Sequence, residues 1–185
     1  MFGKRKSLDR ADFIDRLVHS TLGQWLAQSN AKNNELSRTD FFREAVTSGG
    51  NEAVLAFKKT ELAYMAGFAV NAIEATRDVE FRDEYISQIV NKAAEGLGYQ
   101  GSENELYEYI SKIVDDVVDE FRMIEREGPH ADQARKAIAH NFAHEAFGIT
   151  LDEYDSDFRH LLKHTTMIQR LLVVTSQKSY RKARK

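Results

Sequence analysis

The stretch "LAYMAGFAVNAI", Leu62–Ile73, is twelve residues long and carries no charge. As a helix it would be apolar nearly all round, because Leu62, Met65 and Phe68 point in different directions, and such a helix must be surrounded by others. Its alanines and its glycine keep it thin, so neighbouring backbones can approach closely. A membrane-spanning helix needs about 20 apolar residues. The stretch therefore predicts a buried core helix, and we expect it at the centre of a bundle, within a helix at about 52–77.

Regular helical patterns continue on both sides of this central helix. The 185 residues include one proline and ten glycines, a composition that favours long helices over a turn-rich β fold. Apolar residues recur at spacings of three and four, as in amphipathic helices. We expect an all-α bundle of six or seven helices. The expected helices lie at about 9–28, 40–49, 52–77, 79–95, 103–127, 131–147 and 150–176.

Breaker and capping residues separate these helices. Gly49-Gly50 divides the second expected helix from the third, and Gly128-Pro129 ends the fifth, because glycine adopts a positive φ readily and proline cannot continue a helix. Ser102-x-x-Glu105 and Thr150-x-x-Glu153 are capping boxes, which predict the starts of the fifth and seventh helices. The short link between the last two helices predicts an antiparallel hairpin at about 131–176.

The formal net charge of −3 is unevenly distributed: residues 1–10 carry +3 and residues 178–185 carry +5, which leaves −11 for residues 11–177. An acidic body repels nucleic-acid phosphates and anionic lipid. We therefore expect no membrane contact, and nucleic acid could bind only through the two basic ends. The expected organisation is a basic segment at 1–7, a helical bundle domain at 8–176 and a basic, frayed tail at 177–185.

The chain contains no cysteine, which excludes disulfides and every chemistry that depends on a thiolate. The amino-terminal sequence "MFGKRKSLDR" is basic but is not followed by an apolar signal region. These features predict a cytoplasmic protein.

Two His-x-x-x-His pairs lie on the last two expected helices, His140 with His144 and His160 with His164. An i, i+4 spacing places both imidazoles on one side of a helix, as in helical zinc sites. In the predicted hairpin the first pair is roughly level with Asp157, and His160 lies about one turn further along. If these two faces meet, they form a site for a divalent metal. Its ligands would be His140, His144, Asp157 and His160.

A helical wheel at about 100° per residue favours a different placement of the histidines. It sets both pairs nearly opposite the main apolar stripes, which include Phe142 on one helix and Phe158 and Leu162 on the other. Burying those stripes against the bundle leaves the histidines outward. Met167 and Leu171 lie beside the second pair and predict a small apolar contact patch or dimer surface. We therefore expect no cofactor, with a divalent metal as the alternative.

Glu145 is the charged residue that the wheel turns inward, between Ala134 and Ile138 in angle. A carboxylate at that position needs a partner, such as an arginine or a hydroxyl, or else a raised pKa. We expect a structural ion pair at the edge of the core, and the alternative is a buried acid that lines a pocket. Glu61 and Glu74, at the two ends of the uncharged run, are similar but weaker cases.

The fifth expected helix is strongly acidic: residues 103–127 contain nine acids and three bases. Glu108, Asp115 and Asp119 project from the face opposite its apolar stripe. That face is either solvated or a docking surface for a basic protein partner.

These observations favour a non-catalytic helical protein-interaction module, such as an adaptor, immunity or regulatory subunit. Its partner would be a protein with a basic patch or a second copy of the chain. One alternative is a metal-binding bundle that uses the histidine pairs, as an oxidoreductase or hydrolase would. Another is nucleic-acid binding through the basic ends.

Overall fold

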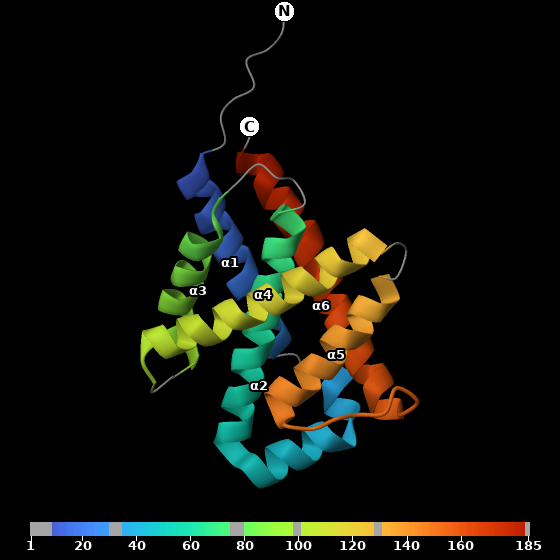
Figure 1. Cartoon of the computed structure of the whole chain (residues 1–185). Helices are drawn as coiled ribbons and strands as arrows, with labels where there is room; N and C mark the ends of the chain where they lie inside the picture. Colours follow the sequence, from blue (N-terminus) through green and yellow to red (C-terminus); the bar gives the residue numbers. More distant parts are fainter. Residues whose placement is uncertain (1–8, 30–34, 75–79, 98–100, 128–130, 184–185) are drawn as a thin grey trace, which may run out of the picture.

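The computed structural model describes residues 9–29, 35–74, 80–97, 101–127 and 131–183. Within these ranges the chain forms six α-helices, one short 3-10 helix and no strand, so the predicted all-α bundle is confirmed (Figure 1). The elements are α1 (Arg10–Ser29), η1 (Glu35–Arg38), α2 (Asp40–Glu74), α3 (Arg82–Leu97), α4 (Glu103–Glu127), α5 (Ala131–Phe147) and α6 (Ser156–Ala183).

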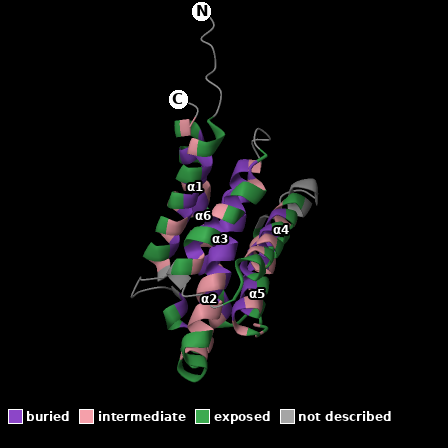
Figure 2. Cartoon of the chain, turned by 90° about the vertical axis from the view of Figure 1, so that its left-hand side faces the viewer, coloured by how far each residue is buried: buried purple, intermediate pink, exposed green. Residues whose placement is uncertain are grey.

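The second half of α2 is the centre of the bundle. Every residue from Thr60 to Val70 is buried, which confirms the central helix predicted from its apolar run. This helix packs against each of the other five α-helices. Figure 2 shows the bundle turned by 90°, with buried and exposed residues alternating along the helices and the exposed ones toward the outside.

Gly50 forms a kink inside α2. Its φ of 54° and ψ of −136° are not helical, and the positive φ suits glycine because it has no Cβ. The predicted break at Gly49-Gly50 is therefore present. The two segments that it separates follow one another directly, so they form one kinked helix, and the bundle has six α-helices in the described residues.

Side-chain caps fix the starts of several helices. Asp9 Oδ1 accepts a hydrogen bond from the backbone N–H of Asp12 at 3.1 Å, at the start of α1. The predicted capping box of α4 is confirmed in both directions: Ser102 Oγ accepts from Glu105 N at 3.2 Å, and Glu105 Oε2 accepts from Ser102 N at 3.1 Å.

The predicted start of the last helix was wrong. The helix α6 begins at Ser156, and Asp155 Oδ1 caps it by accepting from Asp157 N at 2.9 Å. Upstream, Asp152 Oδ1 accepts from Tyr154 N at 2.8 Å, which gives the backbone a local turn in place of a helix. Tyr154, which a helix beginning at Thr150 was expected to turn inward with Phe158 and Leu161, is 93% exposed as a result.

The last two helices pack on each other, and α6 runs back past α5 in the opposite vertical direction in Figure 1. The link between them begins at Gly148, whose φ is 67°. The helix α6 continues through residues 177–183, where we expected a frayed tail, because Ser179 and Tyr180 are buried and Tyr180 packs edge-on against Phe13 of α1. In the described part of the chain, no helix combines the length and the apolar character that crossing a membrane requires.

Candidate functional site

The structure gives the predicted metal-binding histidines different surroundings. The ring of His140 stacks on Phe158 with 4.4 Å between centroids, and His140 Nε2 lies 3.8 Å from Glu153 Oε1. His144 is exposed, and His160 is half-buried. Stacking and a nearby carboxylate account for the orientation of His140 without a metal ligand role.

Asp157, the fourth predicted ligand, caps another helix. Its Oδ2 accepts hydrogen bonds from the backbone N–H groups of Asp40, at 2.8 Å, and Phe41, at 3.4 Å, and so satisfies the start of α2. Across the described ranges, no group of three or more His, Asp or Glu side chains is arranged to hold a metal ion. A metal site at this quartet stays a sequence-based prediction that these contacts do not favour.

His164 corrects the wheel prediction, because its side chain is fully buried. The buried face of α6 is centred on Leu161, Ile168 and Leu172, whereas Leu162, which we placed in the apolar stripe, is half-buried. His164 and Ile168 are four residues apart and differ by only about 40° around the helix. His164 therefore falls inside the buried face.

His164 faces Glu61 of α2 in the interior of the bundle. His164 Nε2 lies 3.2 Å from Glu61 Oε1, and both side chains are completely buried. The two atoms are within ion-pair distance but do not have hydrogen-bond geometry. The ring of Phe142 lies edge-on to the imidazole with 6.1 Å between centroids. Among the described residues, Glu61 is thus the most deeply buried acid. The sequence pattern had ranked it below Glu145.

Glu145 and Glu74 are ion-paired at the edge of the core. Glu145 Oε1 lies 2.9 Å from Lys112 Nζ, and the Glu145 side chain is 25% exposed. The hydrogen bond from Lys112 to this carboxylate raises the pKa of the lysine. Glu74 Oε2 accepts a hydrogen bond from Arg122 Nη2 at 2.5 Å. The structural ion pair expected for Glu145 is present, and its partner is a lysine from α4.

The three acids predicted to bind a partner are all exposed on α4. Two of them already have cationic neighbours within the bundle. Asp115 Oδ1 lies 2.5 Å from Arg82 Nη1, and Asp119 Oδ1 lies 3.5 Å from Arg122 Nη1. These arginines reduce the negative charge that Asp115 and Asp119 offer to a partner, and Glu108 is the remaining member of the face.

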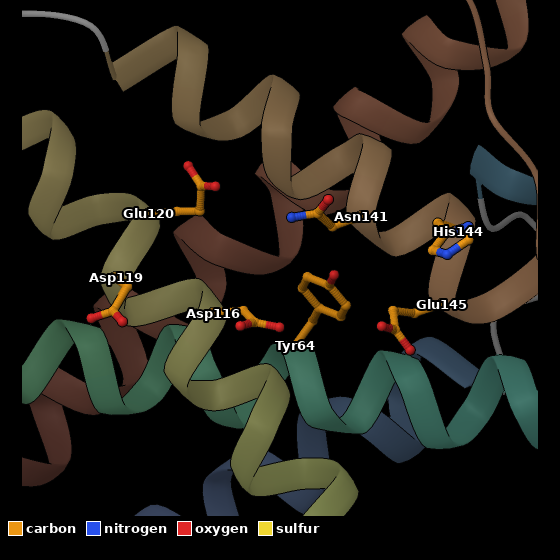
Figure 3. Close-up of a pocket in the computed structure, with 7 residues that line it drawn as sticks. All are labelled: Tyr64, Asp116, Asp119, Glu120, Asn141, His144 and Glu145. Carbon is orange, nitrogen blue, oxygen red and sulfur yellow. The ribbon is translucent and has the colours of Figure 1, made fainter.

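The acidic pocket, as we name it, lies between α4 and α5 over the middle of α2 and has a volume of about 290 Å³ (Figure 3). Its lining residues are Tyr64, Asp116, Asp119, Glu120, Asn141, His144 and Glu145. Asp116 and Glu120 make no ion pair or side-chain hydrogen bond with any described residue. Two acids of α4 without an ion-pair partner therefore lie at this pocket, and the cation near Asp116, Lys112, is already paired with Glu145.

Tyr64 is the innermost lining residue of the acidic pocket. It is only 2% exposed, and none of the described residues forms a hydrogen bond with its hydroxyl. Figure 3 shows its ring rising from α2 between Asp116 and Glu145, with the hydroxyl turned toward Asn141. Burial, reinforced by the negative charge of Glu145, raises the pKa of Tyr64 far above its usual value. The hydroxyl is thus neutral at physiological pH and can both donate and accept.

A second hollow, which we name the α6 groove, lies on the outer side of α6 and has a volume of about 600 Å³. Its lining residues are Arg159, Leu162, Lys163, Thr166, Met167, Arg170 and Leu171. The floor includes the Met167 and Leu171 pair that the sequence marked as an apolar contact patch. Val174 lies one turn beyond and is 50% exposed.

Sequence reasoning missed both the Glu61–His164 pair and the inner members of the acidic pocket. Asp116 and Glu120 were counted among the acids of α4 but were not distinguished from the outward ones. Their i, i+4 spacing is the available signal, since it places them together on one side of a helix. Tyr64 also gave a signal, as the single hydroxyl in the uncharged stretch of the central helix.

The fold and these sites define the chain as an all-helical bundle with an acidic pocket on one side and an apolar, basic-rimmed groove along its last helix. No protein-family model, no curated protein and no solved structure matches it.

Proposed function

We propose that this chain is a non-catalytic helical protein-interaction module, and that the α6 groove docks an amphipathic segment of a partner protein. The observation that carries the proposal is the apolar floor of the groove, formed by Leu162, Met167 and Leu171 on the outside of a bundle that buries most of its large apolar side chains. Exposed apolar surface with a polar rim is typical of protein interaction sites.

The charges on the rim indicate the chemistry of the partner. Arg159 and Arg170 are exposed, and neither side chain forms an ion pair within the described residues. Lys163 adds a third cation to the rim. A complementary segment would carry apolar anchors flanked by Asp or Glu, because electrostatic complementarity guides specific association.

A second copy of the chain fits the groove less well. Two α6 grooves packed face to face would bring Arg159, Lys163 and Arg170 of one copy against the same cations of the other, and like charges at an interface are unfavourable. An anionic membrane is also disfavoured, because residues 11–177 carry a formal charge of −11. The proposal is therefore a hetero-complex with an acidic amphipathic helix.

Reversing two rim charges, R159E/R170E, is expected to weaken the binding of such a helix about tenfold or more, since attraction at the rim becomes repulsion. The probe is a fluorescently labelled synthetic helix with leucines at i, i+3, i+4 and i+7 and glutamates beside them. Binding is measured by fluorescence anisotropy at about 0.15 M salt, where exposed charges further apart than about 8 Å are largely screened.

The matched control is K178E/R181E, which changes the charge of α6 by the same amount outside the groove and should bind the probe as the unaltered chain does. Absence of binding to the unaltered chain, or equal weakening in both variants, would overturn the proposal. So would a dimer in light scattering that Met167→Glu converts to monomers, because that result would assign the groove to a second copy.

The acidic face of α4 is the second candidate surface, for a partner with a basic patch. The observation in its favour is that Asp116 and Glu120 have no ion-pair partner among the described residues, on the same helix as Glu108 and the two arginine-paired acids. Its most specific part is the acidic pocket.

A further inference from the structure

We infer that the acidic pocket between α4 and α5 is a binding site for an organic cation, an alkylammonium or guanidinium group that is held by its carboxylates and by the hydroxyl of Tyr64. This site is separate from the α6 groove, so either proposal can fail without the other. The inference depends on the charge balance of the pocket, on the buried hydroxyl and on the size of the cavity.

The carboxylates of the pocket are only partly neutralised by neighbouring cations, which favours the binding of a further cation. Of its four carboxylates, Glu145 is paired with Lys112 at 2.9 Å, and Asp119 lies 3.5 Å from Arg122. Asp116 and Glu120 have no such partner among the described residues. These two acids are one turn apart on α4 and repel each other, as like charges at i, i+4 do. A bound cation would turn that repulsion into two attractive contacts.

The Tyr64 hydroxyl gives the pocket a polar group at its base. The side chain is 2% exposed, and its hydroxyl has no hydrogen-bond partner in the described chain. The hydroxyl oxygen is not among the fully buried unpaired atoms, so a molecule in the pocket can reach it. Tyr64 lies between Asp116 and Glu145 in Figure 3, so one N–H donor could reach its oxygen while others reach the carboxylates. The hydroxyl thus offers a hydrogen-bonding group at the end of an otherwise buried side chain.

The shape of the site favours an organic cation over a metal ion. The carboxylates are spread around the pocket, and the described residues contain no group of three that could hold a metal ion. A volume of about 290 Å³ suits a single alkyl chain with a cationic head, since pockets for whole drug-sized ligands run from about 300 to about 1,000 Å³.

Two kinds of molecule could supply the alkylammonium or guanidinium group: a free polyamine, or a protein with a lysine or arginine side chain. The test titrates the full chain by calorimetry at about 50 mM salt with spermidine and, in separate arms, with N-acetyl-lysine amide and N-acetyl-arginine amide. Tighter binding of spermidine assigns a free polyamine, and tighter binding of either amide assigns a protein side chain. Absence of saturable binding by all three up to about 10 mM overturns the inference.

The variant D116N/E120Q is expected to weaken binding of the best probe by about tenfold or more, because charge-assisted hydrogen bonds are the stronger kind. Tyr64→Phe removes only the hydroxyl and should weaken it by about threefold to tenfold. The matched control E44Q/E52Q removes two exposed acids of α2, outside the pocket, and should bind normally. Equal weakening in the control would mean non-specific attraction and would overturn the site.

A second measurement guards against a folding defect. Without ligand, D116N/E120Q should melt at the same temperature as the unaltered chain or slightly higher, since the repulsion between the two acids is gone. At a saturating concentration of the cation, the melting temperature should rise for the unaltered chain only. A gain of equal size in the variant would contradict the inference independently of the calorimetry.

Discussion

Replacing His164 with leucine is expected to lower the free energy of unfolding by about 3 kcal/mol, because removing one member of a buried ionisable pair typically costs 3–5 kcal/mol. His164 Nε2 lies 3.2 Å from Glu61 Oε1, and neither side chain is exposed. Leucine would leave the carboxylate of Glu61 in the core without the imidazole that faces it. The measurement is urea unfolding monitored by circular dichroism, and the melting temperature should fall by roughly 10 °C.

The double variant E61L/H164L separates this cost from a simple packing defect. With both ionisable groups replaced by apolar ones, most of the lost stability should return, since well-packed apolar residues often replace a buried ion pair at no net cost. His144→Leu is the matched control, because that histidine is exposed and its loss should change stability by less than about 0.5 kcal/mol. If H164L and H144L were equally stable, the pair would have no structural importance.

Local signals predicted the fold well. The uncharged run at Leu62–Ile73, the Ser102-x-x-Glu105 box and the break at Gly49-Gly50 are each read over one or two helical turns, and each is found in the structure. The Thr150-x-x-Glu153 box has the same pattern and does not start a helix. Asp152 and Asp155 compete for nearby backbone N–H groups, so the strongest cap lies further along the chain.

Such local signals could not predict contacts between helices that are far apart in the sequence. Glu61 and His164 are on helices α2 and α6, and nothing near either residue in the sequence indicates the other. The wheel for α6 was misplaced because Leu162 was counted as core, although it lies at the edge of the buried face and lines the α6 groove. An error in the rotational position of the apolar stripe around the helix axis is enough to move a histidine from the predicted surface to the interior.

The acidic pocket also depends on contacts between helices that the sequence pattern does not specify. Glu145 was placed at the core edge correctly, and its need for a partner was clear from its apolar neighbours. Lys112 is on a different helix, so the identity of that partner depends on how α4 crosses α5. Asp116 and Asp115 are adjacent in sequence, yet Asp115 pairs with Arg82 and Asp116 lines the pocket. Helix packing, which the sequence pattern does not specify, decides which acid keeps its charge uncompensated.

Replacing Gly67 with valine is expected to lower the free energy of unfolding by about 3 kcal/mol, at the upper end of the usual cost of overpacking a core. A Cβ at Gly67 would lie 2.9 Å from the Cβ of Val117, so α2 and α4 approach closely only because this side chain is missing. Urea unfolding should show the loss. The double variant G67V/V117A should be at least about 1 kcal/mol more stable than the two single effects added together, because contacting residues are energetically coupled.

Gly23→Ala is the matched control for this close approach. Gly23 lies within α1, and a Cβ there would meet no atom within 4 Å. Alanine at that position should raise stability by about 0.5–1 kcal/mol, since it favours the helix and crowds nothing. A loss of stability on substitution at Gly67 together with a gain at Gly23 would show that packing decides the effect at Gly67. A stabilising Gly67→Ala would mean that α4 can move away from α2 at little cost, and the central position of α2 would then not depend on its thinness.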